Sequence, residues 1–293
     1  MSNQFTFEAI GTHFWIEIFD DISDKELETT KSRIEFLCSD FNKKYSRFRP
    51  DSQISILNRD RVFQSPSTEL QEILAYGKAL FVRTHQTFNL LTGHILEARG
   101  YDANYSFTPD PIASLASCNP LFDLTIDANQ ILLTCGNIDM GGYGKGWLID
   151  LIAKDLLTNN TKYFLINGGG DMYASSEHEK PITIYLEHPT EVGKYLVKTT
   201  LYNQGFAASS PFKRQWSHKG VKYTHVVSDK EVLPLAAFTK AATATDADAF
   251  ATACGLLSET ELLALSEQEN VSFAQFNPKT NELWQTKNFS MYN

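Results

Sequence analysis

Residues Ala241–Leu257 have the sequence AATATDADAFATACGLL, which is rich in alanine, lacks proline and carries its single glycine near the end. This composition predicts a helix. Asp248 and Thr252 are four residues apart, so their side chains share one face of that helix. A carboxylate and a hydroxyl are hard oxygen ligands that suit Mg²⁺ or Ca²⁺ better than a soft metal. The alternative interpretation is a buried helix of small residues, in which Asp and Thr near its start act as caps.

The rest of the chain has the composition of an ordinary soluble globular protein. It has 293 residues, of which 42% are hydrophobic and 21% are charged. This length allows one large domain or two lobes. The net charge of −9 disfavours nucleic acid and an anionic membrane as general partners, although a local cationic pocket for a phosphate ligand stays compatible with it.

The N-terminus and the cysteines bear on where the protein resides. The opening residues, MSNQFTFEAIGTHFWIEIFDD, lack the basic segment, the long apolar run and the cysteine of secretory and lipoprotein signals. No run approaches the roughly 18 apolar residues of a membrane span. The cysteines (Cys38, Cys118, Cys135 and Cys254) are scattered without a CxxC pair, so zinc is not expected. We therefore predict a cytoplasmic protein with reduced thiols and no membrane span.

Apolar periodicity predicts a mixture of strands and helices. Phe5–Phe19 alternates apolar and polar residues and predicts one strand, kinked or bulged at Gly11. Helices are predicted over Asp24–Phe41, from Ser52 for a short stretch, over Ser67–Thr84, after the glycines of Ile138–Leu157 and over Glu259–Glu267, with a short helix inside the loop Asn104–Cys118. Strands are predicted at Leu121–Ile126, Gln130–Thr134, Tyr163–Asn167, Ile182–Leu186 and Leu196–Leu201, with a terminal hairpin turning at Asn277-Pro278. This order favours an α+β fold with an antiparallel sheet.

Two glycine-rich stretches could bind a phosphate. In IDMGGYGKG (Ile138–Gly146), glycines let the backbone approach a ligand closely and Lys145 offers a point charge. Its spacing matches neither the dinucleotide-binding nor the P-loop motif, and a helix-entry turn with a surface lysine is the alternative. In Asn167–Asp171, backbone amides could hold a phosphate, or Asp171 could bond local amides in a tight turn.

His225 lies between YT and VV, which places it at a strand end or edge. A histidine there could act as a general base near neutral pH, or it could have a purely structural role. The chain offers no serine or cysteine in a nucleophile elbow, so covalent hydrolase chemistry has no support.

Taken together, these stretches resemble one family, the FAD:protein FMN transferases or ApbE-type flavin transferases. The resemblance covers nearly the whole chain in the family's order. Its motifs are AIGT (Ala9–Thr12), YSRFRPDSQISILN (Tyr45–Asn58), FNLLTG (Phe88–Gly93), IDMGGYGKG (Ile138–Gly146), INGGGD (Ile166–Asp171), EHP (Glu187–Pro189), Ser209-Ser210, THVV (Thr224–Val227) and DADAFATA (Asp246–Ala253).

This resemblance implies a fold and a set of site residues. The fold is an antiparallel-sheet α/β sandwich of the ApbE-like T-fold type, with residues 1–293 forming one flavin transferase domain or two lobes with the site between them. The metal site consists of the backbone carbonyl of Gly142 with the side chains of Asp248 and Thr252. His225 matches the family's proposed catalytic base. The implied flavin contacts are Ile10, Phe48, Thr87, Phe88, Asn89, Asp139, Lys145 and Val227.

The chain departs from the family pattern around the flavin and the acceptor. The family usually has Met at the position of Ile10, often an aromatic hydroxyl at that of Phe48, and Asp at that of Asn89. Its Ser-Gly pair is Ser209-Ser210 here, and the turn after His225 is replaced by Ser228-Asp229-Lys230. The metal set is intact.

The resemblance implies metal-dependent transfer of the FMN moiety of FAD to a Thr or Ser hydroxyl of an acceptor protein, with release of AMP. Mg²⁺ is the expected cation, with Ca²⁺ or Mn²⁺ as alternatives, and the acceptor must present an exposed Thr or Ser. The acceptor motif Asp-x-x-Ser/Thr-Gly-Ala-Ser/Thr is absent from this chain, so self-flavinylation is not expected. Two other hypotheses stay open: hydrolysis of FAD to FMN and AMP, and a non-enzymatic FAD-binding module.

Overall fold

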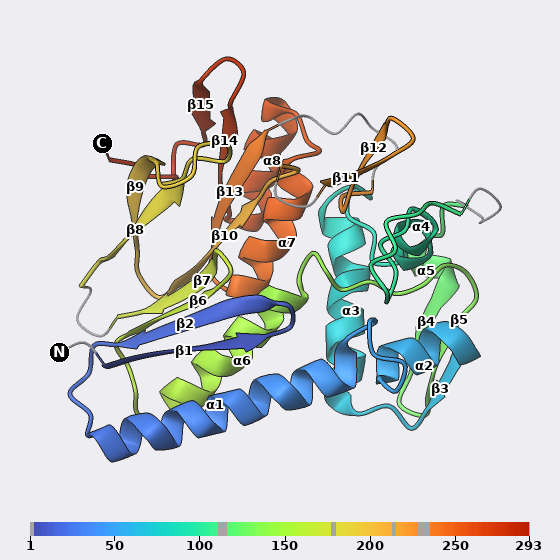
Figure 1. Cartoon of the computed structure of the whole chain (residues 1–293), viewed down its shortest axis with the longest axis horizontal. Coiled ribbons are helices and arrows are strands. Elements are labelled where there is room, and N and C mark those ends of the chain that lie inside the picture. Colours follow the sequence, from blue (N-terminus) through green and yellow to red (C-terminus); the bar gives the residue numbers. More distant parts are fainter. Residues whose placement is uncertain (1–2, 111–115, 177–179, 213–214, 228–234, 293) are drawn as a thin grey trace. The chain divides into compact units, whose positions relative to one another are not determined.

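The computed structural model describes residues 3–110, 116–176, 180–212, 215–227 and 235–292 (Figure 1). The chain divides into two compact units, which are described separately. The first unit consists of Met1–Asp40, Tyr143–Phe212 and Leu233–Asn293, and the second unit of Phe41–Gly142 and Lys213–Val232.

The first unit is built on one eight-stranded antiparallel sheet. Its strand order is β1-β2-β6-β7-β10-β13-β14-β15. These strands are β1 (Asn3–Ala9), β2 (Thr12–Ile18), β6 (Phe164–Gly168), β7 (Asp171–Ser175), β10 (Gln204–Ser209), β13 (Ala236–Ala241), β14 (Ser272–Asn277) and β15 (Glu282–Gln285). With the helices around it, this sheet confirms the predicted α+β class and the antiparallel sheet.

Elements pack on both faces of this sheet. The helices α6 (Gly144–Thr158) and α7 (Ala244–Cys254) cover one face and meet at their N-terminal turns (Figure 1). On the other face, Leu165 of β6 and Phe238 of β13 share an apolar core with a second hairpin, β8 (Ile182–Glu187) and β9 (Tyr195–Leu201). The unit also contains α8 (Glu259–Glu269) and the greater part of α1 (Asp24–Tyr45).

Glycine and a capping carboxylate set the packing of α6 against α7. A Cβ atom added at Gly146 would lie 2.3 Å from the carbonyl oxygen of Ala244, so only glycine permits this approach. Asp150 of α6 accepts hydrogen bonds from the backbone amides of Ala244, at 2.9 Å, and Thr245, at 2.8 Å. Because these amides lie in the first turn of α7, Asp150 satisfies donors that the helix itself cannot.

The second unit contains short helices and two small antiparallel sheets. Its three-stranded sheet has the order β3-β5-β4, and β11 pairs with β12. The elements are α2 (Gln53–Asp60), β3 (Val62–Gln64), α3 (Thr68–Arg83), α4 (Gly93–Ala98), α5 (Pro120–Asp123), β4 (Leu124–Ile126), β5 (Gln130–Leu133), β11 (Gln215–His218) and β12 (Val221–Thr224).

The prediction of one kinked strand over Phe5–Phe19 is wrong. The segment forms two paired strands, β1 and β2, joined at Ile10 and Gly11. Both turn residues have positive φ, 45° and 73°, as a tight two-residue hairpin turn requires. Isoleucine is a poor residue for that conformation, so the sequence lacked the usual Asn-Gly or Asp-Gly signal.

Most of the other predicted elements are confirmed, with changes at their ends. Ser52 and Ser67 cap α2 and α3 through their hydroxyls, and α1 extends beyond its predicted end to Tyr45. Asn119 caps α5, so Leu121–Asp123 is helical and β4 begins only at Leu124. The short helix predicted within Asn104–Cys118 is not found in the described part of that loop, and residues 111–115 lie outside the described residues.

The prediction of reduced thiols is wrong for two of the cysteines. Cys118 and Cys135 form a disulfide, with their Cα atoms 5.6 Å apart across 17 residues of sequence. The β4–β5 hairpin brings them together, a proximity that sequence spacing did not reveal. Cys38 and Cys254 are free and buried, and burial raises the pKa of the Cys38 thiol to about 12. Among the described residues, no helix is both long and apolar enough to cross a membrane.

Lys240 is a buried cation in the first unit. Its side chain on β13 donates hydrogen bonds to the Thr199 hydroxyl and to the carbonyls of Thr200 and Ser290, both at 3.3 Å. Its ammonium also lies 4.7 Å from the ring centroid of Phe289. Burial lowers the pKa of Lys240 from its usual 10.5 to about 8, because the charged form loses its hydration.

We expect the burial of Lys240 to make the free energy of unfolding change with pH in the alkaline range. Below about pH 8, Lys240 is charged in both the folded and the unfolded protein, so the full cost of burying its charge opposes folding. As pH rises from 8 towards 10.5, the folded state loses the proton first, so wild type gains stability relative to Lys240→Met. The expected gain is on the order of 2 kcal/mol. Melting temperatures of both proteins across this range test it, and a constant difference would contradict it.

Candidate active site

In the first unit, one lysine bridges two buried carboxylates. The Lys145 ammonium contacts Oδ2 of Asp171 and lies 3.1 Å from Oδ1 of Asp248. The Asp171 side chain is 3% exposed and that of Asp248 is 6% exposed, so this pairing is largely shielded from water. Together the three groups carry one net negative charge.

Three separate elements supply these side chains. Lys145 lies in the first turn of α6, and Asp171 begins β7 directly after the turn at Gly169 and Gly170. Asp248 lies in α7, and its Oδ2 accepts a hydrogen bond from the backbone amide of Gly146 at 3.1 Å. This places a carboxylate at the positive end of α6, where it is favoured.

The segment Asn167–Asp171 forms the tight turn that is one of its two interpretations, while binding of a phosphate by its amides stays a prediction. The amide of Gly170 donates to the Asn167 side chain at 2.9 Å, and both glycines have positive φ, as in a tight turn. The Asp171 carboxylate, however, accepts from the amide of Ala208 on the neighbouring strand, at 3.4 Å, and pairs with Lys145. The interpretation that Asp171 bonds local amides is therefore wrong.

Burial and opposite charge compete in this cluster. Burial alone lowers the pKa of Lys145, but the charges of Asp171 and Asp248 outweigh it and the pKa is raised. Burial raises the pKa of Asp171 to about 6, against the lowering effect of the Lys145 charge. Lys145 therefore stays protonated at neutral pH and stabilises the two carboxylates beside it.

Asp248 and Thr252 offer oxygen donors of the kind that a hard divalent cation accepts. Oδ1 of Asp248 already pairs with one cation, the Lys145 ammonium. Thr252, half-buried, follows one helical turn later on α7, so its hydroxyl shares the face of Asp248. Carboxylate and hydroxyl oxygens are the donors that Mg²⁺, Ca²⁺ and Mn²⁺ accept.

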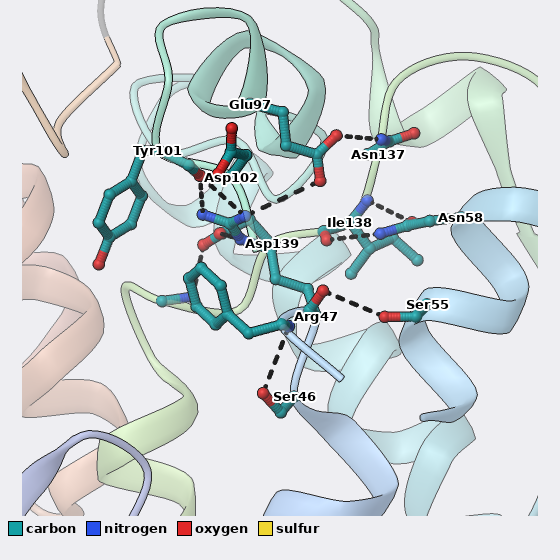
Figure 2. Close-up of polar contacts among 12 residues, drawn as sticks. Ser46, Arg47, Ser55, Asn58, Glu97, Tyr101, Asp102, Asn137, Ile138 and Asp139 are labelled. Carbon is teal, nitrogen blue, oxygen red and sulfur yellow. Dashed lines mark hydrogen bonds and ion pairs between the residues drawn. The ribbon is translucent and has the colours of Figure 1, made fainter. Parts of the chain in front are cut away.

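In the second unit, Arg47 organises a polar network around Asp139 (Figure 2). The guanidinium of Arg47 pairs with Oδ2 of Asp139 through Nε, and both of its terminal nitrogens donate to the carbonyl of Tyr101 at 3.1 Å. Glu97 lies 3.8 Å from the same group. Only 4% of the Arg47 side chain is exposed, so the charge depends on these partners.

The glycine-rich turn that contains Gly142 follows directly on this network. Oδ1 of Asp139 accepts a hydrogen bond from the backbone amide of Gly141 at 2.6 Å. One residue earlier, the backbone of Ile138 exchanges two hydrogen bonds with the side chain of Asn58, at 2.7 and 3.1 Å. Gly142 itself is half-buried and is the last residue of this unit before Tyr143.

Aromatic rings surround Phe48 in the same unit. Phe48 stacks on Tyr105, with ring centroids 5.2 Å apart, and Cζ of Arg47 lies 4.1 Å from the centroid of the Phe48 ring. Tyr101 stacks on Trp216, whose indole nitrogen donates to the carbonyl of Arg99 at 2.9 Å. The two half-exposed rings of this cluster, Tyr105 and Phe107, are 48% and 41% exposed.

The other predicted flavin contacts and the predicted base occupy several places. Ile10 lies at the β1–β2 turn of the first unit. In the second unit, Phe88 is buried and its amide donates to the Thr84 hydroxyl at 3.0 Å, while Asn89 donates to the carbonyl of Cys118 at 2.7 Å. Thr87 and Val227 are half-buried, and His225, also half-buried, follows β12.

Of the predicted residues, the structure brings Lys145 together with Asp248 and joins Phe48 to Asp139 through Arg47. Sequence analysis missed Arg47 and the pairing of Asp171 with Lys145. One of the two arginines in YSRFRPDS and an aspartate after three glycines each had a simpler explanation as turn residues. The signal available was that both lie inside motifs of the family resemblance.

Comparison with known proteins places this arrangement in a family. The model of the ApbE family matches residues 10–275. The chain belongs to the ApbE family. The resemblance that the motifs indicated is thereby confirmed.

Two relatives illustrate the match. The FAD:protein FMN transferase of Haemophilus influenzae is 25% identical over 288 residues, which cover 90% of this chain and 83% of that protein. The FAD:protein FMN transferase of Vibrio cholerae is 20% identical over 281 residues, which cover 92% of this chain and 83% of that protein. Both carry the name of a transferase, in agreement with the enzyme class that the sequence predicts.

Solved ApbE structures confirm the fold. The ApbE protein of Thermotoga maritima has a TM-score of 0.84 at 17% identity, with 98% of this chain and 97% of that chain covered. The apo form of the Pseudomonas stutzeri flavinyl transferase ApbE has a TM-score of 0.76 at 18% identity, with 98% and 94% covered.

We expect Lys145→Met to destabilise the first unit strongly. The substitution leaves two buried carboxylates without their cation, which costs about 3–5 kcal/mol of unfolding free energy. Arg33→Met is the control, because Arg33 pairs with Asp155 at 2.6 Å but is 31% exposed, and its loss should cost about 1 kcal/mol or less. Urea denaturation near neutral pH measures both, and equal losses would contradict the assignment.

Proposed function

We propose that this ApbE-family protein transfers the FMN moiety of FAD to a Thr or Ser hydroxyl of an acceptor protein and releases AMP. The acceptor oxygen forms a bond to the FMN phosphorus, the P–O bond to the AMP phosphate breaks, and AMP leaves with the bond electrons. The observation that carries the proposal is the buried grouping of Lys145 with Asp171 and Asp248. All three residues lie within the part of the chain that matches the ApbE family.

Asp248, Thr252 and the backbone carbonyl of Gly142 are the proposed ligands of a divalent cation, Mg²⁺ in the first instance. When bound, such a cation neutralises the phosphate oxygens and stabilises the departing AMP. Asp248 is the one proposed ligand with a full charge, and the Lys145 ammonium lies 3.1 Å from its Oδ1. Lys145 is also the proposed charge nearest the phosphates of FAD.

His225 is the proposed general base. It would take the proton of the acceptor hydroxyl at a ring nitrogen while the new bond to phosphorus forms. Its half-buried place directly after β12 allows contact with a ligand. The residues that follow it, Ser228-Asp229-Lys230, lie outside the described residues.

The remaining residues of the resemblance are proposed to bind the flavin. Phe48 offers a ring in contact with Tyr101 and Tyr105, a setting that suits a planar aromatic group. The other proposed contacts are Ile10, Thr87, Phe88, Asn89, Asp139 and Val227. The partner is an acceptor protein whose Thr or Ser lies on an exposed segment.

One experiment separates this proposal from its alternatives. The purified protein is incubated with FAD, Mg²⁺ and a peptide that carries an acceptor Thr, with and without EDTA. A mass gain on the peptide equal to FMN, together with AMP and lost in EDTA, supports the transferase. AMP without a mass gain indicates hydrolysis instead, and bound, intact FAD indicates a binding module.

We predict that the charge of Asp248 governs cation affinity. Asp248→Asn should weaken Mg²⁺ binding in the presence of FAD far more than Thr252→Val, because the carboxylate is the charged ligand. Asp171→Asn is the matched control, since it removes the other carboxylate beside Lys145 but no proposed ligand. Calorimetric titration of the three variants with Mg²⁺ in the presence of FAD measures these affinities. Wild-type affinity in Asp248→Asn would overturn the ligand assignment.

We predict that His225→Asn keeps FAD and cation binding but slows transfer by about 10²–10⁴-fold, as expected for loss of a positioned base. His218→Asn is the control, because His218 lies in β11 of the same hairpin and has no proposed role. Single-turnover transfer and FAD affinity are measured on both variants. A wild-type rate in His225→Asn with FAD bound would remove His225 from the catalytic residues.

A further inference from the structure

We propose that Arg47 is a positioning residue that fixes, through Asp139, the turn at Gly141 and Gly142. This inference rests on the proposed function, in which the Gly142 carbonyl is a cation ligand. It adds a residue to which the family resemblance assigned no role, and every contact behind it lies within the second unit.

The first step is that several contacts hold the Arg47 guanidinium in place. Its Nε pairs with Asp139 while its terminal nitrogens donate to the Tyr101 carbonyl, so the planar guanidinium is held along two edges. The Phe48 ring lies 4.1 Å from its central carbon. At the backbone, the Arg47 carbonyl accepts from the Ser55 hydroxyl at 3.1 Å (Figure 2).

The second step is that Asp139 connects Arg47 to the glycine turn. Its Oδ2 pairs with the Arg47 guanidinium, and its Oδ1 accepts a hydrogen bond from the Gly141 amide at 2.6 Å. A Cβ atom added at Gly141 would lie 2.7 Å from that second oxygen, so the turn needs glycine there to approach the carboxylate. This hydrogen bond fixes the peptide between Met140 and Gly141. Because the Gly142 carbonyl lies only two peptide units further along the same turn, we infer that the bond restricts its position.

The third step is that a lysine cannot replace Arg47. An ammonium is a compact point charge and cannot pair with Asp139 while it also reaches the Tyr101 carbonyl in the same plane. Asp139 would keep a positive neighbour but lose its fixed orientation. Arg47→Lys therefore separates orientation from charge.

Hydrogen exchange of the intact protein, followed by mass spectrometry of peptides spanning residues 139–145, tests the turn directly. In Arg47→Met and Arg47→Lys we expect exchange of the Gly141 amide to accelerate about tenfold or more, because its acceptor is no longer held. Arg33→Met, which breaks an arginine–aspartate pair in the first unit, should leave these peptides unchanged.

Cation affinity in the presence of FAD is the second readout. Loss of a group that orients a ligand typically costs about 10–100-fold in metal affinity, and we expect this in both Arg47 variants but not in Arg33→Met. If Arg47→Met fails to fold, Arg47→Lys and Asp139→Asn carry the test. Asp139→Asn combined with Arg47→Lys should bind the cation no more weakly than the weaker single variant, because both act on one turn.

The outcomes distinguish this inference from the proposed function. Unchanged exchange at 139–145 in both Arg47 variants overturns the positioning role, whatever the activity. Faster exchange with wild-type cation affinity also overturns it, because the turn would then not hold a ligand. If wild type binds no cation with FAD, the proposed function fails, and with it the functional part of this inference, while the exchange data still report on the turn.

Discussion

The contact between α6 and α7 is the constraint on which the candidate site of the first unit depends, and the two helices cap each other. Asp150 of α6 accepts the first amides of α7, and Asp248 of α7 accepts the Gly146 amide in the first turn of α6. Each carboxylate therefore lies at the positive end of the partner helix, where backbone donors lack intrahelical acceptors. This exchange requires the helices to approach closely, and Gly146 makes that approach possible.

The same geometry explains why two acids can be buried beside one another. Asp248 is buried because it caps α6, and Asp171 is buried because it opens β7 against β10. Without a cation, burial of both charges would be costly. Lys145 precedes Gly146, whose amide Asp248 caps, so it lies close to Asp248. Its ammonium pairs with both carboxylates and neutralises part of their charge.

How much of this the sequence could predict depends on the range of the interaction. Local signals placed α2, α3 and α7 well, since caps such as Ser52 and Ser67 and the apolar spacing act within a few residues. The β1–β2 hairpin escaped prediction because Ile10 takes a left-handed conformation that its side chain disfavours. The disulfide and the ion pairs of the candidate site join residues far apart in sequence, and periodicity carries no information about such pairings.

The side chain of Asn89 shows how such long-range contacts decide what a single residue does. The Asn89 amide donates to the carbonyl of Cys118, one of the disulfide cysteines, at 2.7 Å, while its oxygen accepts the Leu91 amide at 2.9 Å. An aspartate could make only the second contact, because an ionised carboxylate has no hydrogen to donate. Beside it, the Leu90 carbonyl accepts the amide of Asp139 at 2.8 Å. Asn89 thus ties the segment of Cys118 to residues 89–91, which in turn bind the backbone of Asp139 just before the glycine turn.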